Sequence, residues 1–148
     1  MERIDPARLA ENFIELIGRE GMLVTAGSPE KFNTMTASWG GAGFLWNRPV
    51  AFVFVRPERY TYEFMERETC FTLLGHGDRE AYRICGSKSG RRIDKAAEAG
   101  LTPRPTELGN VAFEQSRLTL ECRKLYASMI NEGLFVDESI YPQWYGET

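Results

Sequence analysis

The sequence of 148 residues has few of the side chains that build metal centres and thiol redox sites. Its three cysteines, Cys70, Cys85 and Cys122, are widely spaced and form no Cys-x-x-Cys pair, so neither a zinc site nor a dithiol motif is indicated. We expect free thiols in buried or half-buried positions. The single histidine, His76, argues against a protein-ligated transition-metal centre. These counts do not exclude a Cys–His nucleophile pair, but nothing around Cys70 or Cys85 suggests one.

Long apolar runs and a surplus of basic residues are also missing. No stretch of about 18 apolar residues is present, so we expect no membrane-spanning helix. The first six residues lack the apolar core of a secretion signal, and we expect a cytoplasmic protein. The net charge of −3 gives no electrostatic reason to expect nucleic acid, because proteins that bind phosphate backbones usually carry a basic face. With no repeat or linker, we expect one domain over residues 1–148.

Short apolar and alternating segments predict a mainly β fold with short helices. Strands are expected at 22–25, 33–39, 50–55, 69–74, 108–113 and 116–126. Helices are expected at 6–17, 60–67, 79–84 and 93–99, with Asp5 as the cap of the first. The 50–55 strand is apolar at nearly every position, so we expect it to be buried on both faces. This succession suggests a closed β-barrel with helical excursions.

Hydroxyl residues alternate with apolar residues in the segment that follows Phe32. Thr34, Thr36 and Ser38 are expected on one face of a strand, and the residues between them on the other. A glycine-rich turn is expected after the strand, at 40–43. Hydroxyls and free backbone amides near glycines suit a phosphate-bearing ligand. Threonine-rich strands are also common on solvated sheet faces, so the pattern alone leaves both interpretations open.

Basic residues gather beside two segments that are rich in Ser, Thr and Gly. They are Arg56, Arg59, Lys88, Arg91 and Arg92. Arginine offers a planar fork to phosphate oxygens, whereas lysine offers a point charge. The start of the helix predicted at 60–67 adds free amides and a favourable dipole for an anion. Each of these cations could equally be a solvated surface charge. The segment 86–90 is not a P-loop, because its lysine lacks the required glycine spacing.

Three motifs in this order resemble the flavin reductase-like family, the FMN-binding split barrels that include the flavoredoxins. They are NTMTASW at 33–39 with the Pro-flanked apolar strand after it, RPERYT at 56–61 and CGSKSGR at 85–91. The resemblance extends from about Val24 to the C-terminus. It implies a split β-barrel that binds FMN at the interface of a homodimer. It also implies an oxidoreductase that passes electrons from NAD(P)H through the flavin to an acceptor that the sequence does not identify.

The resemblance also implies which residues lie near the FMN. The strand that would contact the ring and ribityl chain contains Asn33, Thr34, Met35, Thr36, Ala37, Ser38 and Trp39. The phosphate would lie near Arg56, Arg59, Tyr60 and Thr61, with Ser87, Lys88, Ser89 and Gly90 closing over it. No acid or base residue is implied, because the cofactor carries the chemistry. At 143–145 the chain has Gln-Trp-Tyr where the family pattern has a histidine-containing loop.

Other interpretations remain open from the sequence. Met35 and Trp39, together with Trp46, could be core residues rather than the walls of a flavin slot. A non-catalytic protein that stores or senses FMN would carry the same binding motifs. A barrel of the pyridoxamine-phosphate-oxidase type shares the architecture, although the three motifs suit it less well.

Overall fold

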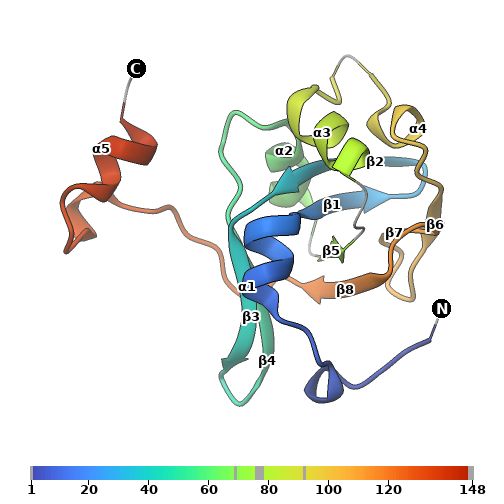
Figure 1. Cartoon of the computed structure of the whole chain (residues 1–148), viewed down its shortest axis with the longest axis horizontal. Coiled ribbons are helices and arrows are strands. Elements are labelled where there is room, and N and C mark those ends of the chain that lie inside the picture. The colour runs from blue at the N-terminus through green and yellow to red at the C-terminus, as the bar shows by residue number, and fades with distance from the viewer. Residues whose placement is uncertain (1, 69, 76–78, 92, 147–148) are drawn as a thin grey trace.

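The computed structural model describes residues 2–68, 70–75, 79–91 and 93–146. A four-stranded antiparallel sheet in the order β2-β1-β5-β8 forms its centre (Figure 1). The strands of this sheet are β1 (Met22–Ser28), β2 (Lys31–Ala37), β5 (Cys70–Gly75) and β8 (Leu118–Arg123). Two further antiparallel pairs are β3 (Gly40–Leu45) with β4 (Arg48–Val53) and β6 (Pro103–Pro105) with β7 (Val111–Phe113). The described strands therefore form three separate sheets, not the single closed barrel that the succession of segments suggested.

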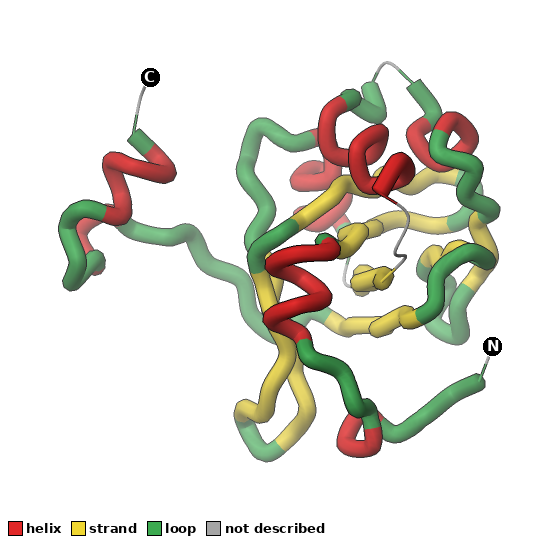
Figure 2. Tube along the Cα trace, in the orientation of Figure 1, coloured by secondary structure: helices red, strands yellow, loops and turns green. Residues whose placement is uncertain are grey.

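Short helices and long loops make up the rest of the chain (Figure 2). The helices are α1 (Phe13–Glu15), α2 (Tyr60–Arg67), α3 (Arg79–Ser87), α4 (Lys95–Glu98) and α5 (Ile140–Tyr145). Three further helical turns are η1 (Pro6–Arg8), η2 (Leu16–Glu20) and η3 (Glu132–Leu134). None of the helices in the described part of the chain has the length and apolar character needed to cross a membrane. His76 and Arg92 lie outside the described residues.

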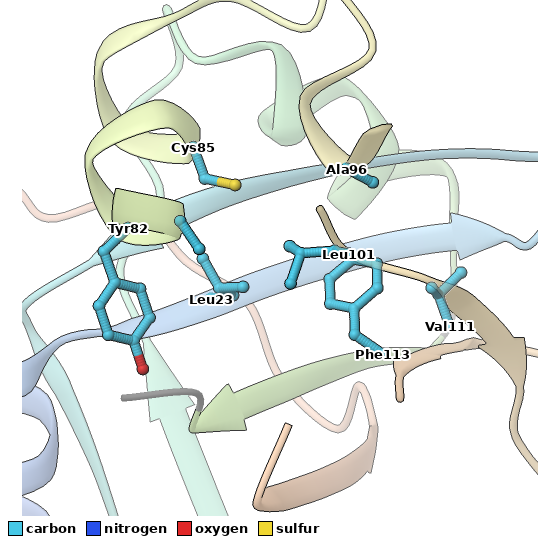
Figure 3. Packing of buried hydrophobic residues seen from close by; sticks show 8 residues of the cluster. Leu23, Tyr82, Cys85, Ala96, Leu101, Val111 and Phe113 are labelled. Atoms are coloured by element: carbon cyan, nitrogen blue, oxygen red, sulfur yellow. The ribbon is translucent and has the colours of Figure 1, made fainter. Parts of the chain in front are cut away.

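Strands β1 and β2 separate two hydrophobic cores, because successive side chains of a strand point to opposite faces. On one face, Val24 and Met35 pack with Phe64 of α2. On the other face, Leu23 packs with residues of α3, α4 and β7, including Cys85 and Phe113 (Figure 3). The register Val24↔Met35 and Leu23↔Thr36 fixes which residues share a face. The pair β1–β2 thus holds α2 on one side and α3 and α4 on the other.

The helix predicted at 6–17 is interrupted, which corrects that expectation. Asp5 caps only the short turn η1, where its carboxylate accepts from the Ala7 amide at 2.9 Å. Asn12 then starts a second helix by accepting from the Glu15 amide at 3.2 Å. An asparagine side chain that bonds to the backbone in this way favours a new helix start over continuation. The second helix runs to Glu20 and ends before Gly21, whose φ is 89°.

The glycines at 40–43 lie inside strand β3 instead of forming the predicted turn. The chain reverses at Trp46 and Asn47, whose φ values are 51° and 58°. A two-residue hairpin with positive φ at both central positions matches the twist of its strands. The missing side chain of Gly41 lets Phe52 approach, since a Cβ there would lie 2.7 Å from the Phe52 Cζ.

Strand β4 is not buried on both faces, although its sequence is almost entirely apolar. Phe52 is 51% exposed, and Phe54 just beyond the strand is 43% exposed. The reason is that the β3–β4 hairpin forms its own two-stranded sheet and projects from the body (Figure 1). Smaller differences concern boundaries: α3 continues to Ser87, the connection at 102–105 contributes β6, and the predicted strands at 108–113 and 116–126 shorten to β7 and β8.

Candidate functional site

A groove of about 560 Å³ opens where the β1–β2 turn and the first half of β2 meet α2, α4 and the loop before α4. Strand β2 lies at the edge of the four-stranded sheet, so one side of its backbone faces away from β1. The groove lining includes Asn33, Thr34, Tyr60, Gly90, Arg91 and Lys95. Five of these, namely Asn33, Thr34, Tyr60, Gly90 and Arg91, are residues that the sequence motifs single out, and the structure brings them together from three distant segments.

A buried hydrogen bond ties β2 to the start of α2. The Asn33 side chain is 5% exposed and donates from Nδ2 to the Thr61 Oγ1 at 2.8 Å. Thr61 itself is fully buried. The loop 88–91 lies against this pair, because a Cβ on Gly90 would come within 1.9 Å of the Asn33 Oδ1 and 3.2 Å of the Tyr60 Cδ2. Only a glycine therefore fits at position 90 with Asn33 in this orientation.

The threonine hydroxyls of β2 make contacts inside the fold. Thr34 shares a hydrogen bond of 2.8 Å with Thr25 of β1, and Thr36 donates to the Tyr82 carbonyl of α3 at 2.6 Å. The face that carries them packs against α3, so these hydroxyls are not displayed to solvent as the alternation suggested. The backbone at the edge of β2 is a second source of donors and acceptors. The Thr34 carbonyl points away from β1, and alternation in an antiparallel pair places the backbone groups of Thr36 on the same edge.

Lys95 belongs to the groove, and the sequence motifs did not single it out. Its side chain is 4% exposed, and its ammonium donates to the Thr34 and Cys85 carbonyls, both at 2.9 Å. Burial, and to a smaller extent the nearby positive charge of Arg59, lower the pKa of Lys95 from 10.5 to about 8. In the sequence this lysine sits in a short predicted helix next to acidic and small residues, a pattern that surface lysines share. Its burial depends on tertiary contacts that no local signal reveals.

Most of the cations that the sequence motifs contain have carboxylate partners. Lys88 pairs with Glu98, Arg91 pairs with Glu63 and lies 4.6 Å above the Tyr60 ring, and Arg56 lies 3.9 Å from Glu58. Arg59 and Lys95 differ, because neither has a carboxylate within ion-pair distance among the described residues. Among the described residues, the Arg59 side chain donates to the Gly86 carbonyl, at 3.5 Å. The site thus holds two neighbouring positive charges that the described part of the chain does not neutralise.

The remaining predicted residues lie outside the groove. Met35 and Ala37 are 4% and 8% exposed and belong to the core beneath α2. Ser38 and Trp39 follow the end of β2 and are exposed. Ser87 ends α3, where its hydroxyl donates to the Arg83 carbonyl at 2.6 Å, and Ser89 accepts from the Arg91 amide at 3.2 Å.

Arg56 forms a second cluster with the C-terminal helix instead of joining the groove. Its guanidinium donates to the Trp144 carbonyl at 3.0 Å and lies 5.8 Å from the Trp39 ring and 5.5 Å from the Tyr145 ring. Trp39 and Trp144 also meet edge to face, with centroids 5.1 Å apart. This aromatic cluster holds α5 against the body. Trp144 and Tyr145 of this cluster belong to the segment 143–145, which stands where the family pattern has its histidine-containing loop.

The buried lysine gives a testable pH dependence. The folded pKa of about 8 lies below the ordinary 10.5, so unfolding takes up a proton above about pH 8 and stability rises with pH. Burial raises the pKa of Cys85 from 9.0 to about 11, which has the opposite effect above about pH 9. Between pH 8 and 9 we expect the unfolding free energy to rise by about 1 kcal/mol relative to Lys95→Met. Denaturant titrations of both proteins measure this slope.

The exposed Lys31 provides the control for this slope. Lys31→Met should follow the wild-type pH dependence, because its side chain lies in solvent. If the unfolding free energy rose equally with pH in the wild type and in Lys95→Met, the lowered pKa of the buried Lys95 would be contradicted.

Comparison with known proteins identifies the architecture. The fold is similar to the flavoredoxin of Desulfovibrio vulgaris (Miyazaki F), with a TM-score of 0.67 and 25% identity over 87% of this chain and 69% of that one. It is also similar to an FMN-binding domain of a flavin reductases-like enzyme from Shewanella baltica, with a TM-score of 0.65 and 20% identity over 77% of this chain and 62% of that one. A Shewanella frigidimarina protein with a split barrel domain gives a TM-score of 0.61 and 18% identity over 75% of this chain and 58% of that one.

These similarities define the fold as a split barrel, mainly β with short helices, as the sequence motifs implied. The model of the flavin reductase like domain matches residues 16–136, and the chain belongs to this family. A comparison with curated proteins gave no match. The chain spans less than two thirds of the length of both Shewanella proteins.

Proposed function

We propose that this chain binds FMN and is an oxidoreductase of the flavin reductase or flavoredoxin type, taking electrons from NAD(P)H and passing them to an acceptor. Membership of the flavin reductase like family supports this proposal. The names of the similar structures, an FMN-binding domain and a flavoredoxin, agree with it. We also propose that the chain acts as a homodimer, which is the assembly implied by the family resemblance.

The observation that carries the proposal is the pair of cations without carboxylates. Arg59 precedes α2 as its N-cap residue, and its side chain makes no capping hydrogen bond within the described part of the chain. Lys95 is close enough that Arg59 lowers its pKa. Arg59 at the N-terminus of α2 and the neighbouring Lys95 repel each other, and a bound anion would offset this repulsion. A phosphate group supplies that charge, and the arginine fork and the lysine ammonium suit its oxygens.

The residues of the groove fit the other parts of FMN. Backbone donors and acceptors on the edge of β2 suit the polar edge of a flavin ring, as do those of glycine-containing loops. The loop 88–91 can lie close over β2 because Gly90 has no side chain. When bound, FMN supplies hydride and single-electron chemistry. The chain's part is to hold the phosphate, orient the ring and limit water, and we assign no acid or base residue.

An absorbance titration of the purified protein with FMN tests the proposal. Binding at micromolar concentration should shift and resolve the flavin bands, and NADH or NADPH should then be oxidised when an acceptor is present. Flavin bands that stay unchanged at micromolar FMN would show no binding and would overturn the cofactor assignment. Stoichiometric flavin without turnover over a broad acceptor panel would instead overturn the oxidoreductase and favour an FMN-storage or sensing protein.

Arg59→Ala should weaken FMN binding by roughly 10- to 100-fold, because a hydrogen bond to a charged group contributes about 1.5–3 kcal/mol. Fluorescence quenching of FMN measures the dissociation constant. The matched control is Arg104→Ala, because Arg104 is an exposed arginine that is paired with Glu114 and is not among the groove-lining residues. Equal affinities for the two variants would remove Arg59 from the phosphate site.

A further inference from the structure

Two apolar segments project from the body of the molecule (Figure 1). One is the β3–β4 hairpin, on which Phe44 is 69% and Trp46 57% exposed. The other is residues 124–146, here called the C-terminal arm, which leaves β8 and ends with α5. On the arm, Met129 is 67% exposed and Val136 is completely exposed. Trp46 and Tyr126 meet with ring centroids 6.4 Å apart, so the two surfaces are continuous.

The solvent-exposed area of the chain is larger than that of a compact monomer of the same mass. The chain has a mass of 16.9 kDa and exposes 9874 Å². A compact monomer of that mass exposes roughly 7,700 Å². The excess of about 2,000 Å² exceeds the roughly 800 Å² that each partner buries in a protein interface of standard size. The surplus area is therefore large enough for a stable protein–protein interface.

The hairpin by itself also lacks the packing that a sheet requires. Strands β3 and β4 pair only with each other among the described strands. An isolated two-stranded sheet is marginally stable in water and needs a third strand or a packed apolar face. The apolar side chains Phe44, Leu45 and Phe52 are each about half exposed or more. A covering surface would supply the burial that the hairpin lacks.

The two segments are complementary in charge. The arm contains Glu132, Asp137 and Glu138, and its one cation, Lys124, lies at its base and donates to the Met65 carbonyl. The hairpin from 40 to 55 contains Arg48 and no acidic residue. In a dimer with a two-fold axis, the arm of each subunit meets the hairpin of the other, so the same contact forms twice. A second copy of the same chain supplies both the apolar covering surface and the complementary charge.

We propose that the C-terminal arm of one copy packs across the β3–β4 hairpin of a second copy, and the reverse, in a two-fold dimer. This names the surfaces of the homodimer proposed above. Val136 and Met129 of each arm then lie against Phe44 and Trp46 of the partner hairpin, and the arm acids lie near Arg48. Within each chain, Trp144 and Tyr145 hold the end of the arm against Arg56 and Trp39.

Val136→Asp and Phe44→Asp test the proposal. Both side chains are exposed in the single chain, so an aspartate at either position costs little unless a partner covers it. Sedimentation at micromolar concentration should give about twice 16.9 kDa for the wild type and 16.9 kDa for either variant. The control Leu108→Asp replaces a side chain that is 60% exposed in the loop between β6 and β7, and should stay dimeric.

A mixture of the two variants separates this interface from misfolding. A heterodimer of Val136→Asp with Phe44→Asp contains one wild-type arm against one wild-type hairpin, so mixing should restore dimers that neither variant forms alone. Misfolded chains would show no such complementation. Two variants that remain dimeric would overturn the arm–hairpin contact and leave the homodimer standing. A monomeric wild type would overturn both, and the FMN proposal, tested by titration, would be unaffected.

Discussion

Gly90→Ala is expected to lower FMN affinity at least tenfold and the unfolding free energy by about 1–3 kcal/mol. The new Cβ would lie 1.9 Å from the Asn33 Oδ1 and 2.8 Å from its Cγ. Relief requires Asn33 to turn away, and this breaks its buried bond to Thr61. A buried donor left without an acceptor costs about 1–3 kcal/mol. The displaced loop 88–91 would no longer close over the edge of β2.

Equilibrium unfolding and FMN titration of the same preparation measure both effects. Gly18→Ala is the matched control, because a Cβ at Gly18 meets nothing within 4 Å. That variant should keep wild-type affinity and stability. A Gly90→Ala protein that binds FMN normally would show that Asn33 adopts another orientation or that the loop does not border the ligand.

Phe64→Ala is expected to destabilise the protein by about 3–5 kcal/mol, which is a large part of the stability of a small domain. Phe64 is 2% exposed and fills the core between α2 and the β1–β2 pair. Its ring also meets Tyr60 edge to face, with centroids 5.0 Å apart. Removing it leaves a cavity and loosens the helix that presents Arg59 and Thr61. Chemical denaturation measures the loss directly.

Leu108→Ala tests whether this loss comes from burial. Leu108 is 60% exposed, so its truncation should change the unfolding free energy by less than about 1 kcal/mol. Saturating FMN should recover part of the Phe64→Ala loss, because a ligand that binds only the folded state stabilises it. A loss below about 1 kcal/mol for Phe64→Ala would contradict the packing of α2 on the sheet.

Local patterns were sufficient for several elements of the fold. The spacing of Tyr60 and Phe64 predicted α2 with the bounds that the structure shows, because one apolar face meets the core. The hydroxyl and apolar alternation predicted β2 to within two residues at each end. The fold class followed from motifs, since three short segments in order resemble one family. That resemblance could be seen without knowing any contact.

Other features depend on contacts between distant segments. The hairpin reverses at Trp46 and Asn47 although three glycines precede them, and a tryptophan with positive φ is uncommon in any sequence pattern. The burial of Lys95 depends on the Thr34 carbonyl, which is 61 residues away in the chain. The motifs placed Arg56 and Arg59 together beside a phosphate, but the aromatic cluster at α5 holds Arg56 elsewhere. No local pattern contains that information.

The bond from Lys95 to the Thr34 carbonyl has a consequence for solubility. Strand β2 ends its sheet, and an open strand edge is a template on which another chain can add a strand. A charged ammonium on that edge occupies one of the acceptors that an incoming strand would need, and an approaching backbone would have to displace it. The same side chain is therefore expected to oppose aggregation of the protein through β2.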